Sequence, residues 1–448
     1  MTAREDLAAR VLDLARAVAG NGSQAEVTVT SSVRGLTRFA RSYVHQNVVD
    51  TSERIRLRVL VDGSWAAVST DRADADALQS AVESAVAAAR LRPPDLAFPG
   101  LAPPAATTGT GNWDDATADA TPDQRVAVVR EFVDAAGGLE TAGYVESMRT
   151  ESVYANTQGR SAAGRVTGCA ADGIARVPGA DGVARQGAVR LADLSGARLG
   201  GVAAAKAKAG ADPRDLPPGD YEVVLEPDCV ADLLHFLLDY GFNGRPVAEG
   251  RSFVRLGEQQ FDPALRIWDA PLDELSTTLP YDAEGTPRRR LDLVADGVST
   301  AVVHDRRTAA AAGTESTGHA VENGERWGPM PFQARVGGGD GGTSAELAGR
   351  MRRGLLVSDF WYTRILDPRT VVITGLTRNG VWLVEDGEIV APVSTLRFTQ
   401  SYPHALAPGA LLGVGSDVAA VSVRGPQVIV AAPSLHLAAW HITGGAAG

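Results

Sequence analysis

The sequence contains little cysteine and histidine for its length. Only two cysteines, Cys169 and Cys229, and seven histidines occur among 448 residues. Two cysteines are too few for a disulfide framework or for a zinc module built from CxxC pairs. A metal site in this chain would therefore need histidine and carboxylate ligands at a recognisable spacing.

Long apolar runs and an excess of positive charge are also absent. No stretch of the sequence reaches the roughly 18 consecutive apolar residues of a membrane-spanning helix, and the charged N-terminal residues lack the apolar segment of a signal peptide. The 43 Lys and Arg residues stand against 54 Asp and Glu residues, so the net charge is −11. We expect a cytoplasmic protein that binds neither nucleic acid nor a membrane.

The first half of the sequence has the periodicity of alternating helices and strands. Apolar residues recur every three or four positions in the predicted helices, whereas they alternate with polar residues in the predicted strands. The predicted helices cover 2–19, 72–91, 121–136 and 197–212. The predicted strands cover 24–31, 33–40, 42–50 and 55–61, and strands dominate 140–194. The Pro-rich segment 92–121 is expected to be a surface excursion without an element of its own.

A Pro-rich segment at 215–219 predicts a domain boundary. It divides the chain into an N-terminal domain over 1–215 and a C-terminal domain over 216–448. After the boundary the pattern predicts a strand over 221–225, a helix over 229–240 and a short helix over 344–353. Further strands are expected over 291–304, 371–375, 380–384, 388–391 and 418–431. These elements together indicate an α+β fold with antiparallel sheets.

The best metal-ligand candidates are His235 and Asp239. They lie four residues apart on the predicted helix 229–240, so they share one face, as the ligands of zinc peptidases do. A hydrolytic zinc site also needs a general-base Glu directly after the first His, and here that position is Phe236. The spacing alone leaves two interpretations open. His235 is either a hydrogen-bonded, half-buried residue of the core or part of a reduced metal site.

Several segments along nearly the whole chain carry a more specific signal together than any one carries alone. They are Leu36–Ala40, His45–Asn47, Tyr154–Gly159, Asp282–Pro287, His304–Ala309, Trp361–Arg364, Thr374–Arg378 and Arg397–Gln400. On these segments the sequence resembles the TldD/PmbA family of metallopeptidase-related proteins, also called TldD/TldE. The resemblance implies an N-terminal α/β domain with an antiparallel sheet and a β-rich, barrel-like C-terminal domain.

The family pairs two related subunits, and only the TldD-type subunit carries an HExxxH helix and a later cysteine ligand. The corresponding segment here runs from His235 to Tyr240, with Phe236 in place of the Glu and Tyr240 in place of the second His. No cysteine follows Cys229. The resemblance therefore implies a non-catalytic TldE/PmbA-like subunit without catalytic or metal-binding residues of its own. Zinc is expected in a TldD-like partner, and the heterodimer would act on unfolded peptides.

Two alternatives stay open. In the first, the chain is an independent metallohydrolase with an altered site at His235 and Asp239. In the second, it is a homodimeric peptide-binding or scaffold protein that has no peptidase partner. Metal content after purification separates the first alternative from the heterodimer. A neighbouring reading frame that encodes HExxxH would favour the heterodimer, and an orphan gene would favour the second alternative.

Overall fold

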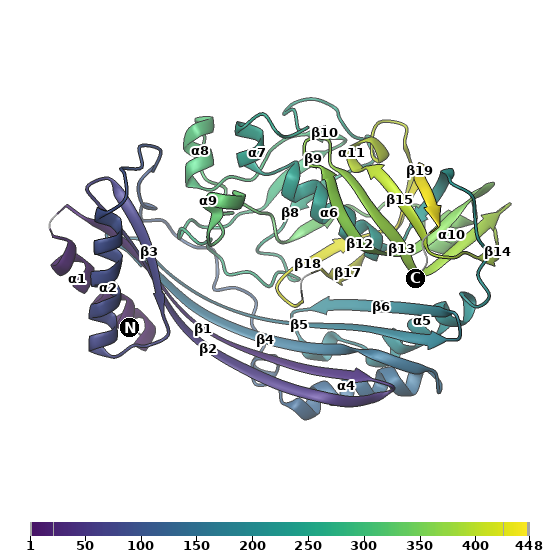
Figure 1. Cartoon of the computed structure of the whole chain (residues 1–448), viewed down its shortest axis with the longest axis horizontal. Helices are drawn as coiled ribbons and strands as arrows, with labels where there is room; N and C mark the ends of the chain where they lie inside the picture. Colours follow the sequence, from purple (N-terminus) through teal and green to yellow (C-terminus); the bar gives the residue numbers. More distant parts are fainter. Residues whose placement is uncertain (1, 21, 424, 446–448) are drawn as a thin grey trace.

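A long, curved antiparallel sheet forms the first part of the chain (Figure 1). The computed structural model describes residues 2–20, 22–423 and 425–445. The strand order is β3-β2-β1-β4-β5-β6. The strands are β1 (Gln24–Ala40), β2 (Tyr43–Val61), β3 (Ser64–Thr70), β4 (Glu140–Asn156), β5 (Ser161–Val177) and β6 (Ala180–Ala188).

The strands of this sheet are longer than the sequence predicts. The pattern predicts separate strands over 24–31 and 33–40, but β1 continues through the polar residues between them. It does so because β1 pairs with β2 on one side and β4 on the other. Asp62 and Gly63 form the turn between β2 and β3, and both have positive φ, 50° and 79°, as a two-residue hairpin turn requires.

Helices cover the convex face of the sheet (Figure 1). They are α1 (Ala3–Ala19), α2 (Ala75–Arg90), the short α3 (Asp115–Ala118), α4 (Pro122–Ala135) and α5 (Gly196–Ala209), and a 3-10 turn covers Leu191–Asp193. Thr2 and Thr121 form the capping boxes that open α1 and α4. The segment 92–121 is not a pure surface excursion, because it contains α3 and the buried Leu101 and Ala102.

The alternation of side chains along β1 separates the two faces of the sheet. Val27 and Val29 are buried in a core with α1 and α2. Thr28 and Thr30 point to the opposite, concave face, where they line a cleft against the second half of the chain. The concave face is therefore the one that meets the β-rich part.

A closed ring of strands forms the centre of the β-rich part. Strand β12 pairs with β7, β7 with β19, β19 with β15, β15 with β13, and β13 again with β12. The ring strands are β7 (Gly219–Leu225), β12 (Arg353–Asp367), β13 (Val372–Glu385), β15 (Leu396–Ser401) and β19 (Leu435–Gly445). Strands β14 (Glu388–Pro392) and β16 (Leu411–Val414) extend it. The expected α+β class with a barrel-like second half is confirmed.

A smaller mixed sheet with the order β10-β9-β8-β11-β18-β17 lies beside the ring. Its strands are β8 (Ile267–Asp269), β9 (Leu291–Ala295), β10 (Val298–Ser299), β11 (Ala334–Val336), β17 (Ala419–Ser422) and β18 (Ile429–Ala432). Helix α6 (Pro227–Tyr240) packs in one core with both. The shorter helices are α7 (Gly244–Ala248), α8 (Arg306–Ala312), α9 (Gly324–Trp327), α10 (Ser344–Ala348) and α11 (Tyr402–Ala405).

Several predicted boundaries in the second half are wrong. The strand expected over 291–304 ends at Ser299, and Asp305 caps the N-terminus of α8. Strand β12 has no counterpart in the prediction, because its outer half is exposed and lacks a clear alternation. The division of the chain between residues 215 and 216 remains a prediction. In the described residues, no helix is long and apolar enough to cross a membrane.

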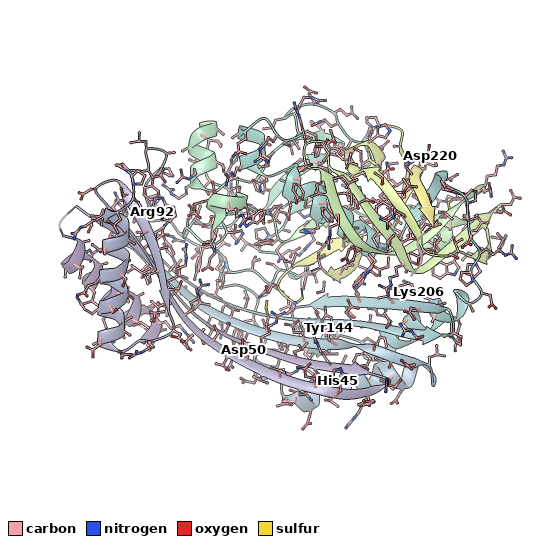
Figure 2. All side chains as sticks on the ribbon, in the orientation of Figure 1. His45, Asp50, Arg92, Tyr144, Lys206 and Asp220 are labelled. Atoms are coloured by element: carbon pink, nitrogen blue, oxygen red, sulfur yellow. The ribbon has the colours of Figure 1, made fainter. Side chains whose placement is uncertain are left out.

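A buried cluster of charges joins the curved sheet to the ring. Arg185 of β6 donates to both oxygens of Asp359 on β12, at 2.7 and 3.1 Å, and to Asp172 of β5 at 2.8 Å. Lys206 of α5 lies at the same seam (Figure 2), where its Nζ contacts Glu226 and Ser358 at 2.6 Å. Because Glu226 is the N-cap residue of α6, the cluster also fixes the start of that helix.

We predict that Arg185→Gln lowers the free energy of unfolding by about 3–5 kcal/mol, because it leaves Asp172 and Asp359 without their cation in a buried setting. Urea unfolding measures the change. The matched control is Arg190→Gln, whose side chain is 60% exposed and whose effect should stay below about 0.5 kcal/mol. Equal urea midpoints for Arg185→Gln and the control would contradict the conclusion that Arg185 joins the curved sheet to the ring.

Candidate functional site

The position of α6 decides which of its side chains are accessible. Pro227 occupies the first turn, and Gly241 follows the last residue, Tyr240. The leucines Leu233, Leu234, Leu237 and Leu238 are all buried in the core. Because an α-helix turns once in 3.6 residues, the residues between these leucines face the opposite side.

That opposite side opens into a cleft of about 570 Å³. All four motif residues predicted from the sequence line it: His235, Phe236, Asp239 and Tyr240. The other walls come from α7, from the segment 321–332 that contains α9, and from Pro368 in the turn between β12 and β13. The structure thus brings the motif together with residues that no sequence motif links to it.

Contacts among the four motif residues are polar on one side and aromatic on the other. His235 Nδ1 lies 3.3 Å from Asp239 Oδ2. The ring of Phe236 stacks on that of Tyr240 with a centroid distance of 6.3 Å and an interplanar angle of 7°. Phe236 also makes an edge contact with Tyr402.

This donor set does not fit a zinc centre. Zinc in peptidases takes three protein ligands and a water, whereas His235 and Asp239 provide two potential ligands that contact each other. Phe236 offers no donor atom at the position of the general base. Among the described residues, no group of three or more His, Cys, Asp or Glu side chains is arranged to hold a metal ion.

Asp232 is an ionisable residue that sequence reasoning missed. It lies one turn before Phe236, where its carboxylate accepts hydrogen bonds from Thr363 at 3.0 Å and Tyr402 at 3.4 Å. Its pKa is raised to about 7, mainly by burial and also by the nearby Asp359, although the hydrogen bonds from Thr363 and Tyr402 and the charge of Arg185 act in the opposite direction. An acid within an otherwise apolar helix was the only sequence signal that could have identified it.

The cysteines offer no nucleophile. Cys229 is buried, and its thiol contacts the carbonyl oxygen of Val357 at 3.5 Å. Burial raises the pKa of its thiol well above the ordinary value, and burial does the same for Cys169. Because the thiolate is the reactive form, both thiols are inert.

A second group resembles a hydrolase triad in its order of contacts. Thr317 Oγ1 lies 2.8 Å from His319 Nδ1, and His319 Nε2 lies 3.0 Å from Asp269 Oδ2. The side chains of His319 and Asp269 are only 0% and 1% exposed. A substrate cannot reach them, and Thr317 also bonds to the backbone of His304, so this group stabilises the fold.

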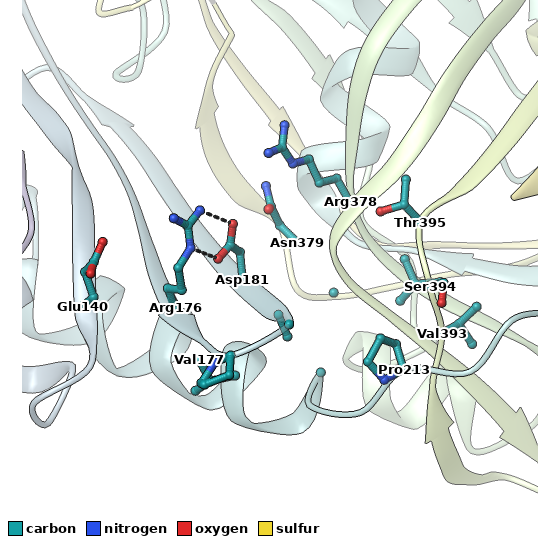
Figure 3. Close-up of a pocket in the computed structure, with 16 residues that line it drawn as sticks. Glu140, Arg176, Val177, Asp181, Pro213, Arg378, Asn379, Val393, Ser394 and Thr395 are labelled. Carbon is teal, nitrogen blue, oxygen red and sulfur yellow. Dashed lines mark hydrogen bonds and ion pairs between the residues drawn. The ribbon is translucent and has the colours of Figure 1, made fainter. Parts of the chain in front are cut away.

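Two further cavities border the curved sheet, and one of these two shares lining residues with the motif cleft. A cleft of about 340 Å³ lies between the concave face of the curved sheet and the segment 277–288, and it shares Val321, Glu322 and Phe332 with the motif cleft. A cavity of about 580 Å³ lies between the turn that joins β5 to β6 and strand β13. Arg176 and Arg378 line it, and Figure 3 shows Arg176 paired with Asp181. It contains none of the motif residues.

Solved structures share this architecture as a whole. The chain is similar to TldE from Thermococcus kodakarensis, with a TM-score of 0.86 and 17% identity over 98% of this chain and 100% of that one. It is also similar to a Thermotoga maritima protein described as a candidate modulator of DNA gyrase, with a TM-score of 0.84, 20% identity and the same coverage. At these identities the likeness establishes the fold, that of TldE-type proteins.

Family models then identify the family. The PmbA/TldA metallopeptidase C-terminal domain matches residues 218–444, and the PmbA/TldA metallopeptidase domain 1 matches residues 25–89. The chain belongs to the PmbA/TldA family, as the sequence resemblance predicts. A metalloprotease from Methanothermobacter thermautotrophicus is 29% identical over 106 residues, which span 23% of each chain.

We predict that Asp232→Asn stabilises the protein above neutral pH. A folded-state pKa of about 7, against an ordinary value of about 3.9, means that the folded protein holds a proton that the unfolded chain releases between these values. The contribution of Asp232 to the free energy of unfolding therefore falls as pH rises from about 4 to about 7. Asn cannot ionise, so the variant should gain roughly 2 kcal/mol or more at pH 8 and nothing at pH 4.

Urea unfolding of both proteins at pH 4, 6 and 8 measures the difference. Asp340→Asn, at an exposed carboxylate, is the control and should follow the wild type at every pH. If Asp232→Asn raised the free energy of unfolding equally at all three pH values, the result would contradict a raised pKa for Asp232.

Proposed function

We propose that this chain is the non-catalytic, TldE-like subunit of a two-subunit peptidase that degrades or processes unfolded peptides. The observation that carries the proposal is the α6 face, where Phe236 and Tyr240 stack in the places of a general base and a second zinc ligand. Phe cannot accept a proton, and Tyr is a poor substitute for neutral imidazole on zinc. A TldD-like partner would supply the zinc, the base and the hydrolytic water.

The clefts support a role in holding peptide. The motif cleft and its neighbour share Val321, Glu322 and Phe332, and they extend from α6 to the concave face of the curved sheet. Thr28, Thr30 and other hydroxyl side chains line the sheet end. The backbone groups of β1 are already paired with β2 and β4. The hydroxyl side chains could instead form hydrogen bonds with the main-chain groups of an extended peptide, whatever its sequence.

The same proposal places the protein in the cytoplasm and excludes a nucleic-acid substrate. The net charge of −11 gives no support for binding to a phosphate backbone. Peptides and the TldD-like subunit are the proposed partners.

The first experiment compares metal and activity in the isolated chain and in the complex. We expect the purified chain to contain substoichiometric zinc and no peptidase activity, and activity to arise when the TldD-like subunit is added. His235→Ala in this chain should change the activity of the complex less than about threefold, since its imidazole would neither bind the metal nor transfer the proton.

The matched control replaces the general-base Glu of the partner's HExxxH helix by Gln, which should abolish activity. Stoichiometric zinc in the isolated chain that is lost in His235→Ala and Asp239→Ala would overturn the proposal and favour an independent metallohydrolase. A stable homodimer that binds no TldD-like subunit would overturn it in favour of a scaffold.

A further inference from the structure

Most charged residues of the motif cleft contact a group of opposite or complementary polarity. His235 contacts Asp239. Glu322 forms an ion pair with Arg54 at 2.7 Å and lies 3.8 Å from Arg56. These pairs account for one imidazole and both carboxylates that line the cleft.

Three guanidinium groups also line the cleft, and two of them share a carboxylate. Arg245 and Arg251 both contact Glu249, which lies outside the cleft lining. Arg326 lies 4.8 Å from the ring centre of Trp327, and no ion pair is found for it among the described residues. The cleft therefore has a spare positive charge beside an aromatic ring.

The apolar walls of the cleft are formed by aromatic side chains. Phe236 and Tyr240 form the stacked pair on α6. On the other side Trp327 is 54% exposed, so its ring is accessible to a ligand. Asn243 donates to the carbonyl oxygen of Trp327 at 2.8 Å, which fixes the backbone of that wall.

We propose that this cleft binds the C-terminal residue of a peptide, with preference for an aromatic or large aliphatic side chain and a free carboxylate. The guanidinium of Arg326 would bind the carboxylate, and the side chain would lie among Phe236, Tyr240 and Trp327. The preceding residues would extend into the neighbouring cleft that shares Val321 with this one. The inference rests on the proposed function, because it assumes that the ligand is a peptide.

Charge complementarity favours the C-terminus of a peptide over an internal peptide segment as the ligand of this cleft. An internal peptide residue presents neutral amides, so it would leave Arg326 without a counter-ion. A terminal carboxylate forms charge-assisted hydrogen bonds with a guanidinium, and it does so next to the side chain that the aromatic walls would hold.

Binding of labelled octapeptides to the full-length chain tests the proposal. Three peptides share one sequence and differ at the end: Phe with a free carboxylate, Phe with a C-terminal amide, and Ala with a free carboxylate. Fluorescence anisotropy should show that the first binds at least tenfold more tightly than either of the others, since hydrogen bonds to charged groups and burial of a Phe ring are each of that size.

Two variants assign the preference to residues. Arg326→Gln should make the Phe acid and the Phe amide bind equally, and Trp327→Ala should reduce the difference between the Phe and Ala endings. Arg289→Gln, at an exposed arginine outside both clefts, should retain the wild-type pattern.

Equal binding of acid and amide by the wild type would overturn the proposal, and so would an unchanged preference in Arg326→Gln. Either result leaves the proposed function intact if the chain still activates a TldD-like subunit. Failure of that activation, with the acid preference retained, would contradict the proposed function and leave a C-terminal peptide site.

Discussion

The structure depends on how firmly α6 is held between the ring of strands and the smaller sheet. Its leucines share one core with strands of both, so the helix can neither rotate nor slide without exposing them. That constraint determines what the cleft contains. Four residues of α6 line the cleft, and Phe236 and Tyr240 also pack against the core. His235 is a potential zinc ligand, whereas Phe236 and Tyr240 have no zinc chemistry to offer.

Attachment of the curved sheet completes the site. The buried cluster around Arg185 and Asp359 ties the sheet to the ring and also fixes the start of α6. At the other end, Arg54 of β2 reaches Glu322 in the wall shared by the two clefts. The neighbouring cleft is therefore formed by both parts of the chain, whereas the motif cleft beside it is lined by the β-rich part alone.

Local signals allowed the helices to be predicted from the sequence, and tertiary contacts explain what was missed. Thr2 and Thr121 mark helix starts by side-chain hydrogen bonds within four residues, so their signals are present in the sequence. Strand β12 depends on pairing with β7 and β13, which lie far away in the chain. The α6 motif was visible because its members are close in sequence. Arg326 could not be identified from the sequence, because only folding brings it to the cleft. Asp232 could not be identified either, because only folding buries its carboxylate.

The most direct test of the central claim is native mass spectrometry of the chain co-expressed with a TldD-like subunit. We predict a complex with one 46.7 kDa copy of this chain, one copy of the partner and one zinc ion. When the complex is dissociated in the gas phase, the zinc should leave with the partner. A zinc ion that stays on this chain would contradict the claim that the aromatic pair on α6 has replaced the metal site.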